Sequence, residues 1–288
     1  MSAGLTPEQR AEQARIIQAL GVLPAIDAQA EVERRSAFLA DYLRVSGLRT
    51  LVVGMSGGVD SLLAGLLVRK AMQRLRAETA GSAAASIGIS LPYGEQRDVA
   101  DARACLALMQ PDQTLVVNIR PAVDALMAGL ETAGLATGAP AQRDFVLGNI
   151  KARQRMVALF AVAGAQAGLV VGTDQAAETL VGFSTKFGDN AADIMPLEGL
   201  NKRQVRTLAR HLGAPDALVD KVPTADLESL SPQRPDEDAF GVSYDEIDDF
   251  LEGKPVSRKA GARILHLWRV SAHKRALPPG PVFSAVRR

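Results

Sequence analysis

The chain has 288 residues, 47% of them hydrophobic and 23% charged, and its 33 basic and 32 acidic residues leave a formal net charge of +1. That length can bury the core of one large α/β domain. The near balance of charge argues against a nucleic-acid partner. No apolar run reaches the roughly 18 residues that a membrane-spanning helix needs, so no membrane partner is expected either.

The first half of the chain changes between helix-like and strand-like periodicity several times. In chain order, the patterns predict an amphipathic helix around Ile17, a helix over residues 30–45, a strand over 51–55, a helix over 62–77, a linker over 80–86 and a strand over 86–91. They continue with a helix through Cys105 and Met109, a strand over 114–118 and an aperiodic stretch over 132–141 that predicts a mobile loop.

The second half repeats this alternation once and then becomes helical. Its predicted elements are a helix over 145–168, a strand over 169–172, a flexible proline-rich and acidic loop over 223–240, and helices over 244–251 and 258–273. Strands and helices alternating at this length predict an α/β fold with a single doubly wound parallel sheet and helices on both faces. Residues 1–288 are expected to form one domain, divided into N-terminal helices over about 5–47, an α/β core over about 48–222, and a loop and C-terminal helices over about 223–288.

Cys105 is the only cysteine, so an intrachain disulfide and a cysteine-rich zinc site are excluded. Its Ala/Leu-rich surroundings predict a small buried apolar residue. A reducing, cytoplasmic setting is expected, since the first residues also lack the basic segment and apolar core of a signal peptide.

The most informative stretch lies between the strand at 51–55 and the helix that follows it. Residues 54–61 read Gly-Met-Ser-Gly-Gly-Val-Asp-Ser. A small-residue turn between a strand and a helix presents backbone N–H groups to an anion, and the two glycines would let the backbone approach a phosphate. The loop has no Walker-type lysine, and it carries Asp60, which would suit a divalent metal bridging phosphates. The alternative is a glycine-rich turn that only connects strand and helix.

A second polar stretch, residues 172–179, also follows a strand and opens a helix. Both stretches would therefore lie at the carboxyl edge of the sheet and could face one pocket. The alternative is plain helix capping, with Thr173 or Asp174 as the N-cap and Glu178 as a first-turn carboxylate.

The Ser-Gly-Gly-Val-Asp-Ser run resembles the pyrophosphate loop of the ATP pyrophosphatases, which cleave ATP between the α- and β-phosphates. Further stretches occur in a characteristic order: residues 92–96, 148–156, 172–178, 186–189, 193–197, 200–204, 223–228 and 273–275. Together they resemble the ammonia-dependent NAD synthetases over residues 30 to 275. That resemblance implies an adenine nucleotide α-hydrolase-like fold.

The resemblance also implies roles for individual residues. Those implied to bind ATP are Gly54, Met55, Ser56, Gly57, Gly58, Val59, Asp60, Ser61, Thr173, Lys202 and Thr224. Those implied to bind the dinucleotide acid deamido-NAD are Arg153, Lys186, Asp193, His273 and Lys274. Asp60 and Glu178 are implied to hold Mg²⁺, and Asp60 and Lys202 to be the catalytic residues.

Each of these residues has a simpler alternative. Residues 151–155 could be a solvated helix flank, Lys202 could be a surface residue, and residues 273–275 could be a basic helix end. Asp189 and Asp193 could serve only turns. The two histidines outside the motifs are expected to be structural or solvent-facing; these are His211 and His266.

The implied reaction is the amidation of deamido-NAD. ATP would adenylate the carboxylate, ammonia would attack the acyl-adenylate, and NAD, AMP and pyrophosphate would leave, as in the last step of NAD biosynthesis. Neither a covalent enzyme intermediate nor an indispensable general base is expected, although Asp189 or Asp193 could take a proton from ammonium. The chain lacks a glutaminase domain, so free ammonia should be the nitrogen donor. The resemblance also implies a homodimer.

Three features depart from the family pattern: Ser184 where an aromatic residue is common, the long loop at 132–141, and the proline-rich tail after Arg275. Two other classes of function stay open. One is another ligase of the ATP pyrophosphatase type, although the chain has neither a basic RNA-binding face nor paired cysteines. The other is a non-catalytic nucleotide-binding protein on the same fold, which would have no use for the carboxylates Asp60 and Glu178. An inactive paralogue is also open.

Overall fold

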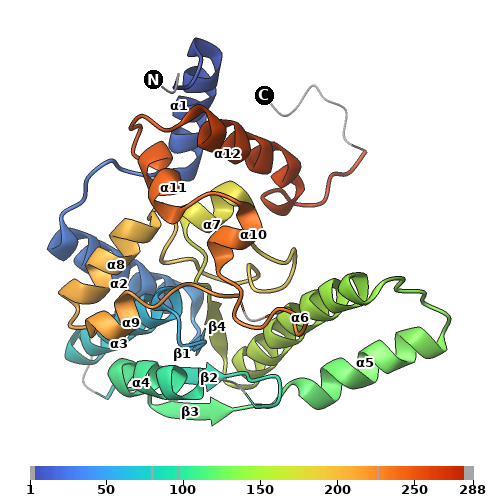
Figure 1. The fold of residues 1–288 in the computed structure, drawn as a ribbon. Helices are drawn as coiled ribbons and strands as arrows, with labels where there is room; N and C mark the ends of the chain where they lie inside the picture. The colour runs from blue at the N-terminus through green and yellow to red at the C-terminus, as the bar shows by residue number, and fades with distance from the viewer. Residues whose placement is uncertain (1–3, 79–80, 96–97, 226, 282–288) are drawn as a thin grey trace.

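A computed structural model describes residues 4–78, 81–95, 98–225 and 227–281 (Figure 1). Positions 80, 96 and 226, which fall in the predicted linker and in two of the family-like stretches, lie outside these described residues. Four parallel strands form one sheet in the order β3-β2-β1-β4. The strands are β1 (Thr50–Gly54), β2 (Ala85–Ser90), β3 (Gln113–Val116) and β4 (Gly168–Val171).

The strand order reverses direction between β1 and β4. From β1 the chain steps outward to β2 and β3, then returns to place β4 on the other side of β1. The connection that leaves β1 leads toward β2, whereas β4 lies on the other side of β1, and a crevice is expected at the carboxyl ends of two strands related in this way. Residues 54–61 and 172–179 both begin at this crevice.

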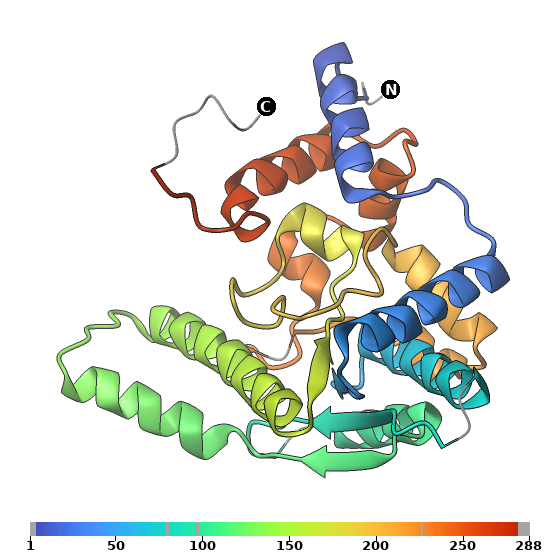
Figure 2. The ribbon, with the colours of Figure 1, turned by 180° about the vertical axis from the view of Figure 1, so that it is seen from behind.

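Helices surround the sheet, and a further group of helices lies to one side of it (Figures 1 and 2). They are α1 (Pro7–Leu20), α2 (Ala28–Ser46), α3 (Val59–Glu78), α4 (Val99–Met109), α5 (Arg120–Thr132), α6 (Pro140–Ala165), α7 (Ala176–Val181), α8 (Lys202–His211), α9 (Asp216–Val219), α10 (Asp236–Phe240), α11 (Tyr244–Leu251) and α12 (Arg258–Val270), followed by the 3₁₀ turn η1 (Ala272–Lys274). Within the described ranges, none of them combines the length and apolarity needed to cross a membrane.

Alternate side chains of each strand face opposite layers, as the period of two residues requires. Leu51 and Val53 of β1 pack with α2, α3, α4 and α8 on one face. Val52 packs with apolar residues of α5 and α6 on the other face. The predicted parallel sheet with helices on both faces is therefore confirmed.

The helices from the two ends of the chain lie together (Figure 2). Ile16 of α1, Leu180 of α7 and Ile264 of α12 belong to one buried cluster, and Glu12 pairs with Arg269. The opening amphipathic helix thus packs on the body of the protein, as expected.

Several element boundaries differ from the predictions. The long helix begins at Pro140, because proline has the helical φ and needs no N–H partner at a first helical position, so the connection shrinks to residues 133–139. Residues 223–240 are not simply a flexible loop: Thr224 pairs with Pro235 in an isolated antiparallel bridge, and α10 follows. The last helix ends at Val270 and passes into η1. The helix α5 was not predicted, and of α8 only a first turn at Lys202 was considered.

Candidate active site

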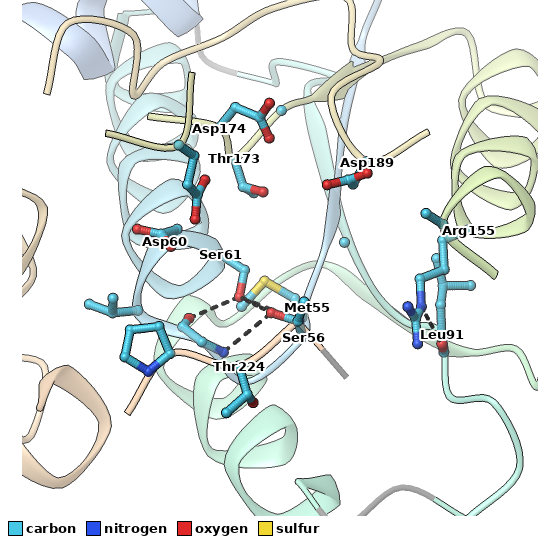
Figure 3. Close-up of a pocket in the computed structure, with 18 of the residues that line it drawn as sticks. Met55, Ser56, Asp60, Ser61, Leu91, Arg155, Thr173, Asp174, Asp189 and Thr224 are labelled. Atoms are coloured by element: carbon cyan, nitrogen blue, oxygen red, sulfur yellow. Dashed lines mark hydrogen bonds between the residues drawn. The ribbon is translucent and has the colours of Figure 1, made fainter. Parts of the chain in front are cut away.

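A cavity of about 260 Å³ lies at the carboxyl ends of β1 and β4 (Figure 3). The loop after β1, the first residues after β4 and the side chain of Lys202 from α8 all line it. The expectation that residues 54–61 and 172–178 face one pocket is confirmed. The residues implied for ATP or metal that line this cavity are Gly54, Met55, Ser56, Gly58, Val59, Asp60, Ser61, Thr173, Glu178, Lys202 and Thr224.

The loop after β1 is held in shape by its own serines (Figure 3). The hydroxyl of Ser61 donates to the carbonyl of Gly58 at 3.0 Å and lies 3.1 Å from the hydroxyl of Ser56. Ser56 in turn accepts from the backbone N–H of Gly58 at 3.3 Å. These hydroxyls already have partners inside the loop, so they shape it as well as line the cavity.

The two adjacent glycines of this loop meet different surroundings. Gly57 has a φ of +90°, and a Cβ on it would lie 2.9 Å from the backbone nitrogen of Ala102 in α4. Gly58 lines the cavity, and a Cβ there would meet only the Ser56 hydroxyl, at 3.5 Å. Gly57 is therefore required by the backbone and by packing on α4, whereas Gly58 is the glycine that keeps the approach to the cavity open.

The ammonium of Lys202 occupies the centre of the charged part of the site. It lies 2.5 Å from a carboxylate oxygen of Asp60 and 3.7 Å from one of Glu178, and its side chain is 1% exposed. The ring of Tyr244 covers it at 4.8 Å. Burial would lower the pKa of Lys202, but the charges of Asp60 and Glu178 raise it above its ordinary value. The interpretation of Lys202 as a surface residue is wrong.

Local sequence explains how α8 delivers this lysine. Asn201 and Gln204 form a reciprocal capping box at the start of α8. The carboxylate of Asp248 accepts from the backbone N–H groups of Lys202 and Arg203, at 3.0 and 2.7 Å. The Asn-x-x-Gln spacing was a signal from which the helix could have been predicted.

More carboxylates surround the cavity than Lys202 can neutralise (Figure 3). Burial, followed by the charge of Asp60, raises the pKa of Glu178 well above its ordinary value. Burial, with the charges of Asp189 and Asp60, raises the pKa of Asp174 to about 8. Burial raises the pKa of Asp236 to about 6. An excess of buried carboxylates creates a site that favours a further cation.

The oxygen donors of the cavity fit Mg²⁺. The second carboxylate oxygen of Asp60 is buried and has no hydrogen-bond partner, and the same is true of one oxygen of Asp236. Among the described residues no group of three acidic, histidine or cysteine side chains is arranged to hold a metal alone. Mg²⁺ commonly takes one or two carboxylates and completes its shell with phosphate oxygens and water, which matches a pair such as Asp60 and Glu178.

The residues implied for deamido-NAD are not gathered in this cavity. Arg153 donates to the carbonyl of Lys186 at 3.2 Å, away from the lining. The carboxylate of Asp193 accepts from the backbone N–H of Val170 at 2.7 Å, so it supports β4. His273 is exposed in η1.

Lys274 lies in a second cavity of about 210 Å³, where it donates to the carbonyls of Gly182 and Ser184 at 2.8 and 2.6 Å. The two cavities share four lining residues: Phe183, Asp189, Ala225 and Leu227. The second cavity is thus next to the first, on the side of α6 and η1.

Several lining residues had no individual role in the sequence interpretation. Arg155 lines the first cavity and donates to the carbonyl of Leu91 at 3.2 Å (Figure 3). Lys151, which is not among the lining residues of either cavity, is 3% exposed, so the solvated-flank interpretation is wrong for it, whereas Arg153 is exposed, as that interpretation expects. Lys221 also lines the cavity and pairs with Asp98 at 2.9 Å. The clustering of polar side chains on one side of α6 was a usable signal for Arg155, whereas nothing local marked the pair of Lys221 and Asp98.

The remaining predictions for single residues concern side chains away from the cavity. Cys105 is fully buried, as expected, and burial raises the pKa of its thiol to about 11. His266 is exposed, and exposed His211 lies 3.0 Å from the Gln29 side chain. These three residues are structural or solvent-facing.

Comparison with known proteins places this chain in a family. The family model described as NAD synthase matches residues 31–278. A Paraburkholderia phytofirmans protein named NH(3)-dependent NAD(+) synthetase is 57% identical over 271 residues, 94% of each chain. A crystal structure of NAD+ synthetase from Burkholderia pseudomallei is 53% identical, with a TM-score of 0.82 over 95% of this chain and 99% of that one. A structure of NMN synthetase from Francisella tularensis is 34% identical, with a TM-score of 0.78 over 90% and 100%.

Fold, cavity and similarity agree along nearly the whole chain. A glycine-rich loop, a buried lysine and two carboxylates meet at the crevice between β1 and β4. The chain belongs to the NAD synthase family.

Proposed function

We propose that this protein is an ammonia-dependent NAD synthetase, a ligase that amidates deamido-NAD at the expense of ATP and releases NAD, AMP and pyrophosphate. This is the final step of NAD biosynthesis. The observation that carries the proposal is the meeting of the loop at 54–61 with Asp60, Glu178 and Lys202 in one cavity. The relative that is 57% identical bears the corresponding name.

ATP binds in the first cavity. The loop at 54–61 and the N-terminus of α3 receive its phosphates, because backbone N–H groups and the helix dipole favour an anion there. Lys202 supplies a positive charge, because its carboxylate partners Asp60 and Glu178 keep the amine protonated in spite of its burial. Thr173 and Thr224 line the same cavity and contribute hydroxyl donors.

Asp60 and Glu178 hold Mg²⁺. The buried, unpartnered oxygen of Asp60 supports this assignment, since a buried carboxylate oxygen without a partner is costly. When bound, Mg²⁺ neutralises charge on the phosphate oxygens. Asp60 also positions Lys202, so a change at Asp60 affects both the metal and the ammonium.

The reaction consists of two substitutions. In the first, a carboxylate oxygen of the nicotinate attacks the α-phosphorus of ATP and pyrophosphate leaves. That oxygen is now part of an AMP group, which is a good leaving group. The chain's contribution is positioning and charge, as in other phosphoryl transfers. In the second, ammonia attacks the acyl carbon and AMP leaves.

Ammonium must lose a proton before it can attack. Asp189 lines both cavities, and burial raises the pKa of its carboxyl above the ordinary value. We assign the acceptance of this proton to Asp189. Both candidates accept a backbone N–H, Asp189 from Thr185 and Asp193 from Val170, but Asp193 is among the lining residues of neither cavity.

A homodimer completes the proposal. Five large apolar side chains stand exposed on the hairpin formed by α5 and α6: Leu126, Leu130, Leu135, Phe145 and Val157. This hairpin reaches out from the sheet in both ribbon views (Figures 1 and 2). Exposed apolar patches of this kind mark interaction surfaces. In the dimer, both copies contribute residues to the dinucleotide site. The binding residues are Arg153, Lys186, Asp193, His273 and Lys274.

One assay tests the function. The purified protein is mixed with ATP, Mg²⁺, ammonium and deamido-NAD, and NAD and pyrophosphate are measured together. Equal amounts of both products are expected. Glutamine in place of ammonium should give no NAD, and the mononucleotide acid should react less well than the dinucleotide. Preference for the mononucleotide would refute the dinucleotide acceptor and favour the activity named for the NMN synthetase relative. Pyrophosphate without NAD would refute the proposed acceptor or nitrogen donor.

The metal assignment has a separate test. Mg²⁺ added to the metal-free protein with ATP should raise the melting temperature, as binding to the folded state must. The shift should be lost in Glu178→Gln. An equal shift in this variant would contradict the assignment.

A further inference from the structure

Helix α6 carries a buried polar stripe that the proposed reaction does not use. Asp144, Gly148 and Lys151 are spaced at i, i+4 and i+7, so they lie on one side of the helix. Asp144 is 7% exposed and Lys151 is 3% exposed. A buried aspartate and a buried lysine need partners, because each loses its hydration.

Asp144 finds its partners in a segment more than 80 residues further along the chain. One carboxylate oxygen accepts from the backbone N–H of Ser229 at 2.9 Å, and the other accepts from that of Leu230 at 2.9 Å. A carboxylate that accepts two backbone N–H groups fixes the direction of the segment that donates them.

Lys151 holds the same segment two turns further along α6. Its ammonium donates to the carbonyl of Leu227 and to the hydroxyl of Ser229, both at 2.8 Å, and lies 4.3 Å above the ring of Tyr93. Between the two charged residues, a Cβ on Gly148 would come within 3.3 Å of the Leu227 carbonyl oxygen. The helix therefore presents a carboxylate, a residue without a side chain and an ammonium group to residues 227–230.

Residues 227–230 matter to the site because of what they join. Leu227 lines both cavities, and Thr224, three positions earlier, lines the first. On the other side, Thr224 pairs with Pro235 in an isolated bridge. Thr224 and Leu227 belong to one wall of the first cavity, and residues 227–230 attach this wall to α6.

We propose that Asp144 and Lys151 are positioning residues for the ATP site, which act by holding residues 227–230 against α6 and so placing Thr224 in the cavity. This inference rests on the proposed function, since it assigns ATP to the first cavity. Neither residue touches the substrate; both act through the wall.

The test uses Asp144→Asn, Lys151→Met and Ser229→Ala in the full-length protein. Asp144→Asn keeps the shape of the side chain and removes one acceptor, and Ser229→Ala removes only the exposed hydroxyl that Lys151 contacts. Asp41→Asn and Arg44→Met are matched controls, since both break the exposed Asp41–Arg44 ion pair of 2.6 Å on α2, and Arg44→Met also breaks the exposed pair with Glu78. Amide hydrogen exchange of the ATP-free protein and steady-state kinetics are measured for all five variants.

In Asp144→Asn, the amides of Ser229 and Leu230 should exchange roughly tenfold faster, the factor expected when about one net hydrogen bond is lost. The KM for ATP should rise roughly tenfold in Asp144→Asn and Lys151→Met and about twofold to threefold in Ser229→Ala, with the KM for ammonium unchanged. The controls should match the parent protein.

Unchanged exchange at residues 229 and 230 in Asp144→Asn would overturn the proposed contact. An unchanged KM for ATP in variants with faster exchange would overturn the positioning role. If the parent protein made no NAD, the proposed function would fail, yet exchange and calorimetric ATP binding would still decide this inference. If Lys151→Met did not fold, Asp144→Asn and Ser229→Ala would carry the test.

Discussion

Lys202 of α8 and Asp60 of α3, separated by 142 positions in the sequence, place an ammonium nitrogen 2.5 Å from a carboxylate oxygen inside the cavity. The lysine has 1% of its side chain exposed and the aspartate 17%. Both charges have left bulk water, so each depends on the other and on Glu178. This pair links the proposed phosphate and metal sites to the packing of α3 on α8.

Asp60→Asn should abolish pyrophosphate release, with a loss of at least about a hundredfold in kcat. The substitution removes a proposed metal ligand and the nearest counter-charge of Lys202. Unfolding in urea should show a loss of stability of a few kcal/mol as well, since the ammonium stays buried. Asp41→Asn, on the surface of α2, is the control for both measurements. Full activity in Asp60→Asn would remove Asp60 from the metal site.

The two adjacent glycines of the loop should respond differently to alanine. Gly57→Ala should lower stability by about 1–3 kcal/mol and activity with it, because φ is +90° and the new Cβ would meet the backbone of α4. Gly58→Ala should stay within about 1 kcal/mol of the parent and mainly raise the KM for ATP. Denaturant unfolding and initial rates separate the two outcomes. Equal destabilisation by both would contradict this division of roles.

Asp248 should make stability depend on pH. Burial raises its pKa from the ordinary 3.8 to about 6, so between these values the folded state holds a proton that the unfolded state has released. Raising the pH through this window therefore destabilises the fold, by roughly 3 kcal/mol for this group. Urea unfolding from about pH 4 to pH 7 should show a shallower decline in Asp248→Asn. A slope identical to that of the parent would show that Asp248 does not titrate in this range.

The exposed apolar side chains of α5 should maintain the homodimer. Leu126→Asp and Leu130→Asp place a charge on this surface, and both should shift the protein toward monomers in light scattering at micromolar concentration. Val45→Asp is the matched control, because Val45 is 87% exposed on α2, away from the hairpin. A parent protein that is monomeric at all concentrations would refute the dimer itself.

Local patterns were enough for most of the sheet and for its loop. The apolar run at 51–53 is buried in β1, and the Gly-rich turn after it opens α3, because strand alternation and turn chemistry act over a few residues. The start of α6 at Pro140 and the bridge between Thr224 and Pro235 were missed. The first has a local signal, whereas the second joins two residues of a stretch that has no periodic pattern.

The amino-acid sequence alone established the α/β class, the family and the glycine-rich loop after the first strand, because each is recorded in short-range order along the chain. The three-dimensional packing established which charges are buried together. Lys202 leaves the surface only because α8 packs on α3 and faces Asp60, and Asp193 supports β4 because its carboxylate reaches the N–H of Val170. Coulomb and desolvation energies depend on distance and burial, and neither quantity is written in the order of the residues.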